Sequence, residues 1–233
     1  MNELNPFILA YGESGTAKTG LISTIENPLV ISSSPTIIRL QDKKDMRVVH
    51  VDSIESLEAV IDSLGEPKSL EYAWHCFDSL TQITEAALLS GGSTDRKAYM
   101  LVQNRLMRCL LKLTTTRHRP TYCTAWEKPV TNADGEQRSF PSFPGQALVG
   151  KIPHLFTNIM HMHMADDNGT EIIAARTKKT LTSYGKDESG RLPDIIKNPD
   201  LSEILRLIRG EKNVPSRPST QVDRSKPFEG RKI

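Results

Sequence analysis

The stretch PFILAYGESGTAKT, residues 6–19, decides the fold. Its first part, PFILAY, is an uncharged apolar run of the kind that forms a buried strand. GESGTAKT (Gly12–Thr19) follows and fits the pattern G-x-x-x-x-G-K-[ST], except that Ala17 takes the second glycine position. We expect a helix from about residue 18 to 25, so the pattern stands between a strand and a helix, as it must. The sequence therefore predicts a loop whose backbone N–H groups surround phosphate oxygens.

Each part of this loop has a predicted role. Gly12 and Gly15 allow a tight turn and a close approach of the backbone to phosphate. Lys18 would reach the β- and γ-phosphates, Thr19 would bind Mg²⁺, and the helix N-terminus would add its dipole. The alternative is a Gly/Ser-rich turn with a chance lysine. The predicted nucleotide-binding residues are Gly12, Glu13, Ser14, Gly15, Thr16, Ala17, Lys18, Thr19 and Gly20.

A second apolar run, YAWHCFDSL (Tyr72–Leu80), ends a predicted strand in Asp78. A carboxylate at the carboxyl end of a strand beside the phosphate loop is suited to the Mg²⁺ side of a nucleotide site. We therefore predict Thr19 and Asp78 as metal ligands. The alternative is that Asp78 is the N-cap of the next helix, with Ser79 as another candidate for that cap.

Outward from these motifs, the apolar residues alternate between strand and helix periodicity. Further strands are predicted at residues 28–32, 47–51 and 121–126, and helices at 56–64, 79–89, 97–115 and 201–208. This alternation predicts an α/β fold with a mostly parallel sheet flanked by helices. The segments Ile159–Met164 and Glu171–Ala175 flank the turn DDNG, which predicts an antiparallel hairpin at one edge of the sheet.

Composition limits the organisation of the chain. Its 233 residues are 37% hydrophobic and 25% charged, which fits one domain with an attachment. Residues 211–233 hold six Lys/Arg, three Asp/Glu and three Pro, so we predict a flexible basic tail after a domain at residues 1–210. The tail's net charge of +3 leaves −1 for the domain, from a total of +2. Any DNA contact must then come from local patches rather than from a globally basic surface.

Several classes of protein do not fit the sequence. No run approaches the ~18 apolar residues of a membrane span, and the N-terminus lacks the basic and apolar regions of a secretory signal. Cys76, Cys109 and Cys123 form no CxxC pair and lie in apolar runs, as reduced core thiols do. A disulfide scaffold and a zinc ribbon are therefore not expected, and we predict a cytoplasmic protein with no membrane partner.

The order strand, GxxGxxKT loop, helix, then strand–DSL, resembles the RecA-like P-loop ATPase core. The later pieces are Pro141–Met162, EIIAARTKKTLTSYG (Glu171–Gly185) and Leu192–Ile208. Their order resembles the phage-borne RecA-like nucleotide-binding proteins, some of which are single-strand annealing recombinases. The resemblance covers roughly residues 6–210. It implies ATP and Mg²⁺ as cofactors, and single-stranded DNA as a partner in phage recombination or replication. It also implies a single-strand DNA-binding protein as helper and the host cytoplasm as location.

One departure from the RecA-like pattern concerns hydrolysis. RecA-like enzymes usually place a catalytic glutamate just after the second strand, but here Ser32–Ser34 occupy that position. Glu127, at the end of YCTAWE, is the candidate, which makes the predicted catalytic residues Lys18, Asp78 and Glu127. The alternatives for Glu127 are a polar sensor residue and a surface charge. A nucleotide-dependent scaffold with little hydrolysis is therefore the second interpretation. A small-molecule kinase is the third, although no Arg-rich lid follows the core.

Arg176, Lys178 and Lys179 follow the predicted edge hairpin. In RecA-like filaments, basic residues at about this point complete the nucleotide site of the neighbouring subunit. The resemblance thus implies a homo-oligomer, ring or filament, in which these three residues act in trans. The alternative is a solvated basic strand end.

Three smaller sets of residues have two interpretations each. Arg105, Arg108 and Lys112 form either a phosphate-backbone track or a solvated helix face. His161 and His163 are either a pair of metal ligands or core and edge histidines. The loop Lys128–Phe140 is a hairpin that either faces DNA or does not. Trp126, Phe140 and Phe143 either stack on bases or pack in the protein.

Overall fold

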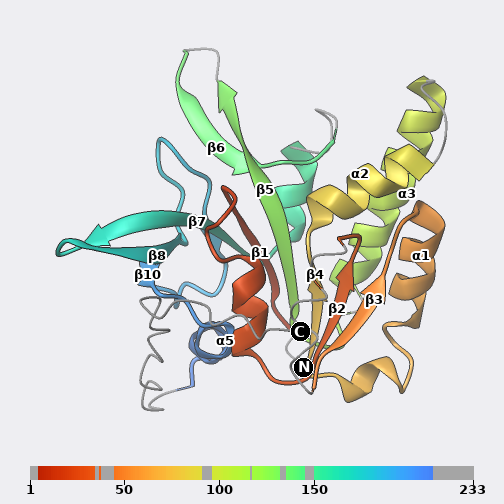
Figure 1. Cartoon of the computed structure of the whole chain (residues 1–233), viewed down its shortest axis with the longest axis horizontal. Helices are drawn as coiled ribbons and strands as arrows, with labels where there is room; N and C mark the ends of the chain where they lie inside the picture. Colours follow the sequence, from red (N-terminus) through yellow and green to blue (C-terminus); the bar gives the residue numbers. More distant parts are fainter. Residues whose placement is uncertain are drawn as a thin grey trace, which may run out of the picture.

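The computed structural model describes residues 5–34, 37, 45–90, 96–115, 117–131, 135–144 and 150–211. The predicted tail, apart from Glu211, lies outside these residues. The described strands form one mixed sheet in the order β10-β8-β7-β1-β5-β4-β2-β3 (Figure 1). Its parallel strands are β1 (Phe7–Gly12), β2 (Pro28–Ser32), β3 (Arg47–His50), β4 (Trp74–Phe77), β5 (Thr121–Thr131) and β7 (Asn158–Asp167). The prediction of an α/β fold with a largely parallel sheet is confirmed.

Strand β1 lies at the centre of the sheet, between β7 and β5, and every one of its residues is buried. Phe7, Leu9 and Tyr11 face one core, which the helices α1 (Ile54–Ser63), α2 (Leu80–Ser90) and α3 (Arg96–Thr115) cover. Ile8 and Ala10 face the other core, which holds η1 (Thr19–Thr24) and α5 (Leu201–Arg209). Burial on both faces explains why the β1 sequence is continuously apolar rather than alternating.

The helix after the phosphate loop is shorter than the sequence predicts. It is the six-residue 3-10 helix η1, in which the N–H of Leu21 is shared between the carbonyls of Ala17 (3.0 Å) and Lys18 (3.3 Å). A single short helix carries a smaller dipole than the predicted one. Any anion at this loop would thus depend more on individual N–H groups than on a helix macrodipole.

The basic stripe on α3 forms ion pairs with α1. Arg105 bonds to Glu55 and Glu58, and Lys112 bonds to Asp62 at 2.6 Å. Arg108 is exposed on the same helix. These ion pairs favour the solvated-face interpretation for Arg105 and Lys112, because α1 carboxylates lie against both cations. A solvated face with interhelical pairs describes this surface.

The antiparallel edge is larger than predicted. β7 and β8 (Thr170–Arg176) form the expected hairpin, whose two-residue turn has Asn168 and Gly169 at positive φ, as a type I′ turn requires. The strands β6 (Gln137–Pro141), β9 (Lys186–Asp187) and β10 (Ile195–Lys197) add further antiparallel pairs. β5 and β6 form a second hairpin, which projects beyond the sheet (Figure 1). The remaining helical turns are η3 (Ser69–Glu71) and η4 (Ile152–Leu155).

The helices of the described chain fall short of the length and hydrophobicity that crossing a bilayer requires. All three cysteines are buried and free, as predicted.

Candidate functional site

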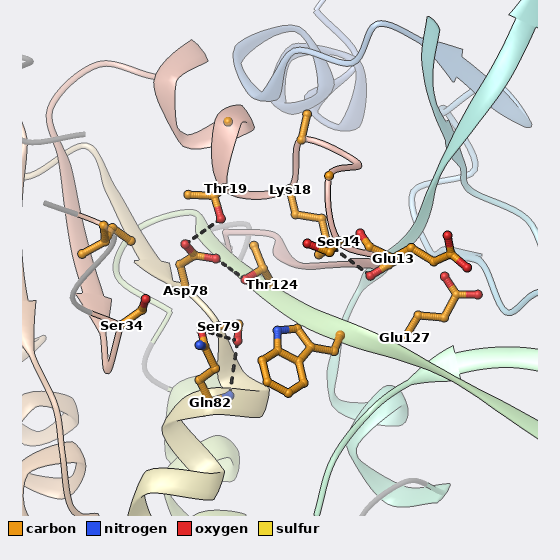
Figure 2. Close-up of a pocket in the computed structure, with 16 residues that line it drawn as sticks. Glu13, Ser14, Lys18, Thr19, Ser34, Asp78, Ser79, Gln82, Thr124 and Glu127 are labelled. Carbon is orange, nitrogen blue, oxygen red and sulfur yellow. Dashed lines mark hydrogen bonds between the residues drawn. The ribbon is translucent and has the colours of Figure 1, made fainter. Parts of the chain in front are cut away.

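The predicted motifs meet in one pocket of about 820 Å³ at the carboxyl ends of β1 and β4, beside the middle of β5 (Figure 2). Eight of the nine predicted nucleotide-binding residues line it, together with Asp78 and Glu127. Thr16 does not, because it is buried and its hydroxyl donates to the carbonyl of Glu13 (2.8 Å). Trp126, one of the aromatic candidates, also lines the pocket, and the lining residues that the sequence did not indicate as ligand-binding are Ser34, Ile37, Ser79, Gln82 and Thr124.

The loop conformation explains its small residues. A Cβ atom on Gly12 would lie 2.2 Å from the carbonyl oxygen of Met162 on β7, so the strand pairing leaves no room for a side chain there. Ala17, at the position where the pattern has glycine, adopts φ 58. An alanine in this left-handed region costs about 1 kcal/mol relative to glycine. The loop thus has the positive-φ turn that the pattern implies, with some strain at Ala17.

We predict that Gly12→Ala destabilises the fold by at least about 1–3 kcal/mol, the usual cost of overpacking, because the β7 backbone cannot move away without breaking its pairing with β1. The free energy of unfolding in urea measures this. Gly150→Ala is the matched control, since nothing lies within 4 Å of a Cβ at that position and its φ is not positive. Equal stability of the two variants would contradict the close packing of β1 on β7.

The Lys18 ammonium group folds back over the loop. It donates to the carbonyls of Gly12 (2.7 Å) and Glu13 (2.6 Å), with Thr16 Oγ1 at 3.3 Å. Its own carbonyl accepts from the buried hydroxyl of Tyr122 (2.9 Å), which anchors the backbone at this point. Burial lowers the pKa of Lys18, and the negative charges of Asp78, Glu127 and Glu13 oppose that shift. Lys18 Nζ is therefore held at the wall of the pocket.

The Asp78 carboxylate joins the loop to the neighbouring strands. Oδ2 accepts from the hydroxyl of Thr19 (2.8 Å), 59 residues away in the chain, and Oδ1 accepts from the hydroxyl of Thr124 on β5 (Figure 2). The hydroxyl of Ser32, at the end of β2, donates to the Asp78 carbonyl. Burial raises the pKa of Asp78, while the two hydroxyl donors and Lys18 lower it. Thr19 and Asp78, the two residues predicted as metal ligands, are thus in direct contact.

Ser79, rather than Asp78, caps helix α2. The N–H of Gln82 donates to Ser79 Oγ at 3.2 Å, which is the N-cap contact of the first turn. The interpretation of Asp78 as the helix cap is wrong, and its carboxylate remains in the pocket.

Glu127 lies at the far wall of the pocket and pairs with a histidine. His161 Nε2 lies 3.2 Å from Glu127 Oε2, and both side chains are largely buried. Glu127 is therefore not a freely solvated surface charge. The sequence indicated His161 as a metal ligand or as a core or edge histidine, but it gave no sign of this partner, which is 34 residues away. The described residues contain no His, Cys, Asp and Glu cluster that could hold a metal ion, so the metal interpretation of the two histidines has no support.

The three aromatic residues predicted either to stack on bases or to pack in the protein lie in different environments. Trp126 is 44% exposed and lines the pocket, whereas Phe143 is buried in the core. Phe140, on β6, stacks on Tyr184 at 5.4 Å between ring centroids. Packing therefore describes Phe140 and Phe143, and only Trp126 of the three is placed to meet a ligand.

The three basic residues predicted to act in trans also lie in different places. Arg176 lies directly across the β7–β8 ladder from His161. Lys178 and Lys179 line a second, smaller pocket of about 170 Å³ that shares no lining residue with the first. Lys178 is paired with Asp194 at 2.5 Å, and both side chains are exposed. Neither lysine lines the phosphate pocket of its own chain, and their action in trans stays a prediction.

Neither a protein-family model nor a curated protein matches this chain.

Proposed function

We propose that this chain is a RecA-like P-loop ATPase that binds ATP with Mg²⁺ and acts on single-stranded DNA in phage recombination or replication. The observation that carries the nucleotide part is the meeting of Lys18 with the Thr19–Asp78 pair in one pocket, beyond the ends of the parallel strands β1 and β4. A glycine-containing loop, a lysine and a hydroxyl–carboxylate pair are together the parts that phosphoryl-transfer sites use. The strand β5, which lies between β1 and β4, adds Thr124 and Glu127 to the same pocket.

The residues present fit a magnesium ion. A threonine hydroxyl and a carboxylate are hard oxygen ligands, which Mg²⁺ prefers, and it usually takes only one or two protein ligands besides phosphate and water. Thr19 and Asp78 would hold it. When bound, the ion neutralises charge on the phosphates. A cation beside Asp78 also favours the charged carboxylate, against the burial that raises its pKa.

The DNA part of the proposal rests on the resemblance of the later segments to phage RecA-like proteins. The second candidate function is a nucleotide-dependent scaffold with little hydrolysis, and the end of β2 favours it. Ser32 bonds there to the Asp78 backbone and Ser34 lines the pocket, so this strand supplies no carboxylate. Glu127 is then the candidate that decides between the two functions.

One experiment separates the interpretations: ATP turnover is measured with and without single-stranded DNA, together with nucleotide affinity. Stimulation of turnover by DNA supports the proposal. Nucleotide binding without turnover supports the scaffold, and phosphate transfer to a small acceptor supports the kinase. No nucleotide binding at all would exclude all three.

We predict that Asp78→Asn keeps the fold but lowers Mg²⁺-dependent turnover by roughly 10- to 100-fold, as the loss of a charged contact of about 1.5–3 kcal/mol implies. Metal-free nucleotide binding should fall much less. Steady-state turnover and binding with and without EDTA measure the two effects. Asp62→Asn, an exposed carboxylate on α1, is the control. A melting shift with normal turnover would reduce Asp78 to a structural residue.

A further inference from the structure

Glu127 and His161 meet across the end of β1. Their strands, β5 and β7, flank β1 on either side, and His161 is aligned with Tyr11 in the β1–β7 ladder. Trp126 is aligned with Gly12 in the β1–β5 ladder, so Glu127 lies one residue beyond the point where β1 ends. The His161 ring thus reaches past the end of β1 to the Glu127 carboxylate.

The His161 ring is held from both sides. It stacks on Tyr11, with 4.9 Å between ring centroids and 25° between planes, and on His163 at 5.4 Å. Tyr11 is itself fixed, because its hydroxyl donates toward the carbonyls of Ser139 (3.0 Å) and Tyr184 (2.8 Å) and accepts from the Tyr184 N–H (2.8 Å). Imidazole orientation at this position is therefore set by packing rather than by solvent.

The Glu127 carboxylate differs from the other two acids of the pocket, Asp78 and Glu13, in its hydrogen-bond partner and its exposure. Asp78 is already bonded to Thr19 and Thr124, and Glu13 is an exposed loop residue. Among the residues that the structure describes, the side-chain partner of the Glu127 carboxylate is His161, through Oε2. Oε1 is thus available for another hydrogen bond at the pocket wall.

We propose that His161 is a positioning residue for Glu127: its Nε2–H holds Oε2, so that the carboxylate stays at the pocket wall and orients the water that attacks the nucleotide. This inference rests on the proposed ATPase function. In that reaction the water oxygen bonds to the γ-phosphorus, the bond to the bridging oxygen breaks to leave ADP, and the water proton passes to Glu127 before its release to solvent. A carboxylate orients water only if it is itself oriented, which the His161 bond provides.

The charged surroundings of His161 fit this role. The groups that face it are Glu127 from β5, Tyr11 from β1, His163 from its own strand and Arg176 from β8. Burial lowers the pKa of His161, and the Glu127 carboxylate opposes that shift. A neutral imidazole can still donate its Nε2–H, so the contact does not require protonation.

Two variants of the full-length protein separate donation from packing. His161→Phe keeps a ring on Tyr11 but removes the donor, whereas His161→Gln keeps an N–H near the position of Nε2. We expect His161→Phe to lower kcat about 100-fold with little change in nucleotide affinity, the cost of a misplaced reacting group. His161→Gln should recover most of that loss. His154→Phe is the matched control and should stay near wild type, since His154 is an exposed residue of η4 outside the pocket.

A double-variant cycle tests whether His161 acts through Glu127. If it does, adding His161→Phe to Glu127→Gln should cost no further turnover, because residues that act as a unit are not additive. Additive losses would overturn the inference. So would normal kcat in His161→Phe, or an equal loss in the Phe and Gln variants, which would indicate a packing role.

A measurement without turnover distinguishes failure of the inference from failure of the proposed function. NMR titration of the His161 ring should give a lower pKa in Glu127→Gln than in wild type, because the carboxylate favours the imidazolium. An unchanged pKa would overturn the pairing even in an active ATPase. A lowered pKa in a protein that binds nucleotide but does not turn it over would leave the pairing intact. It would nevertheless overturn its role in hydrolysis, together with the ATPase proposal.

Discussion

Lys18→Ala is expected to weaken nucleotide binding by roughly 30-fold to several-thousand-fold and to abolish turnover. A charged contact at a partly desolvated site typically contributes about 2–5 kcal/mol, and each 1.4 kcal/mol is about tenfold in affinity. In this structure Lys18 Nζ donates to two loop carbonyls at 2.6–2.7 Å, and Lys18 lines the pocket. A phosphate oxygen would replace a carbonyl as acceptor, which strengthens the contact because the acceptor is then charged.

The measurement is calorimetric titration with ADP and with a non-hydrolysable ATP analogue, alongside steady-state turnover. Lys112→Ala is the control, because this lysine lies on α3 and pairs with Asp62 of α1, outside the pocket. A melting curve near that of wild type would show that Lys18→Ala is folded. Unchanged nucleotide affinity and rate in the folded variant would end the ATPase interpretation.

The sequence was most informative where one local pattern determines the structure. The continuous apolar run of β1 predicts a buried strand, and in the structure both faces of that strand are covered. The strand β2 is found at its predicted bounds, Pro28–Ser32. The α3 prediction is nearly as good, since its apolar residues repeat at helical spacing over 20 residues. Long periodic segments determine their own structure, so these elements could be read directly from the chain.

The elements that were missed are short or depend on their neighbours. β9 has two residues and β10 has three, and each exists only because it pairs with a strand already in the sheet. The sequence overestimates the length of the helix after the phosphate loop, because apolar spacing does not distinguish a 3-10 helix from an α-helix over six residues.

The site divides in the same way. Lys18, Thr19 and Asp78 were predicted because each follows a motif with a required position relative to a strand end. The contacts of Thr124 with Asp78 and of His161 with Glu127 were not predicted. They depend on which strands are neighbours, and strand order is a tertiary property. The contacts Thr124–Asp78 and His161–Glu127 join residues 46 and 34 positions apart, which no local pattern records.

The mixing of two inactive variants is expected to restore ATP turnover. The first variant is Lys18→Ala, which lacks a working loop. The second replaces Arg176, Lys178 and Lys179 with alanine, which removes the proposed trans donors. In a ring or filament with head-to-tail interfaces, about one interface in four of an equal mixture would join an intact loop to intact donors. A cation supplied in trans to the transferring phosphoryl group can raise the rate by about 10³-fold or more, so even this minority should be detectable.

The geometry of one chain explains why the donors are expected in trans. Lys178 and Lys179 line a pocket that shares no lining residue with the phosphate pocket, which fits their predicted action on the nucleotide of a neighbouring subunit. The Lys178–Asp194 pair does not prevent this. Both of its side chains are more than 60% exposed, and exposed ion pairs contribute about 0–1 kcal/mol. Opening the pair at an interface would therefore cost little.

Arg176 needs a separate variant because it lies beside His161 in its own chain. If it acts in cis through the Glu127–His161 pair, the triple variant is inactive for that reason and cannot be rescued at its own loop. A variant with Lys178→Ala and Lys179→Ala alone distinguishes the cases. Rescue of the double variant but not of the triple would assign Arg176 to its own site and the lysines to the neighbour's. Full turnover by a monomer would contradict the predicted oligomer. An oligomer in which the triple variant stays active would show that the donor residue lies elsewhere on the surface.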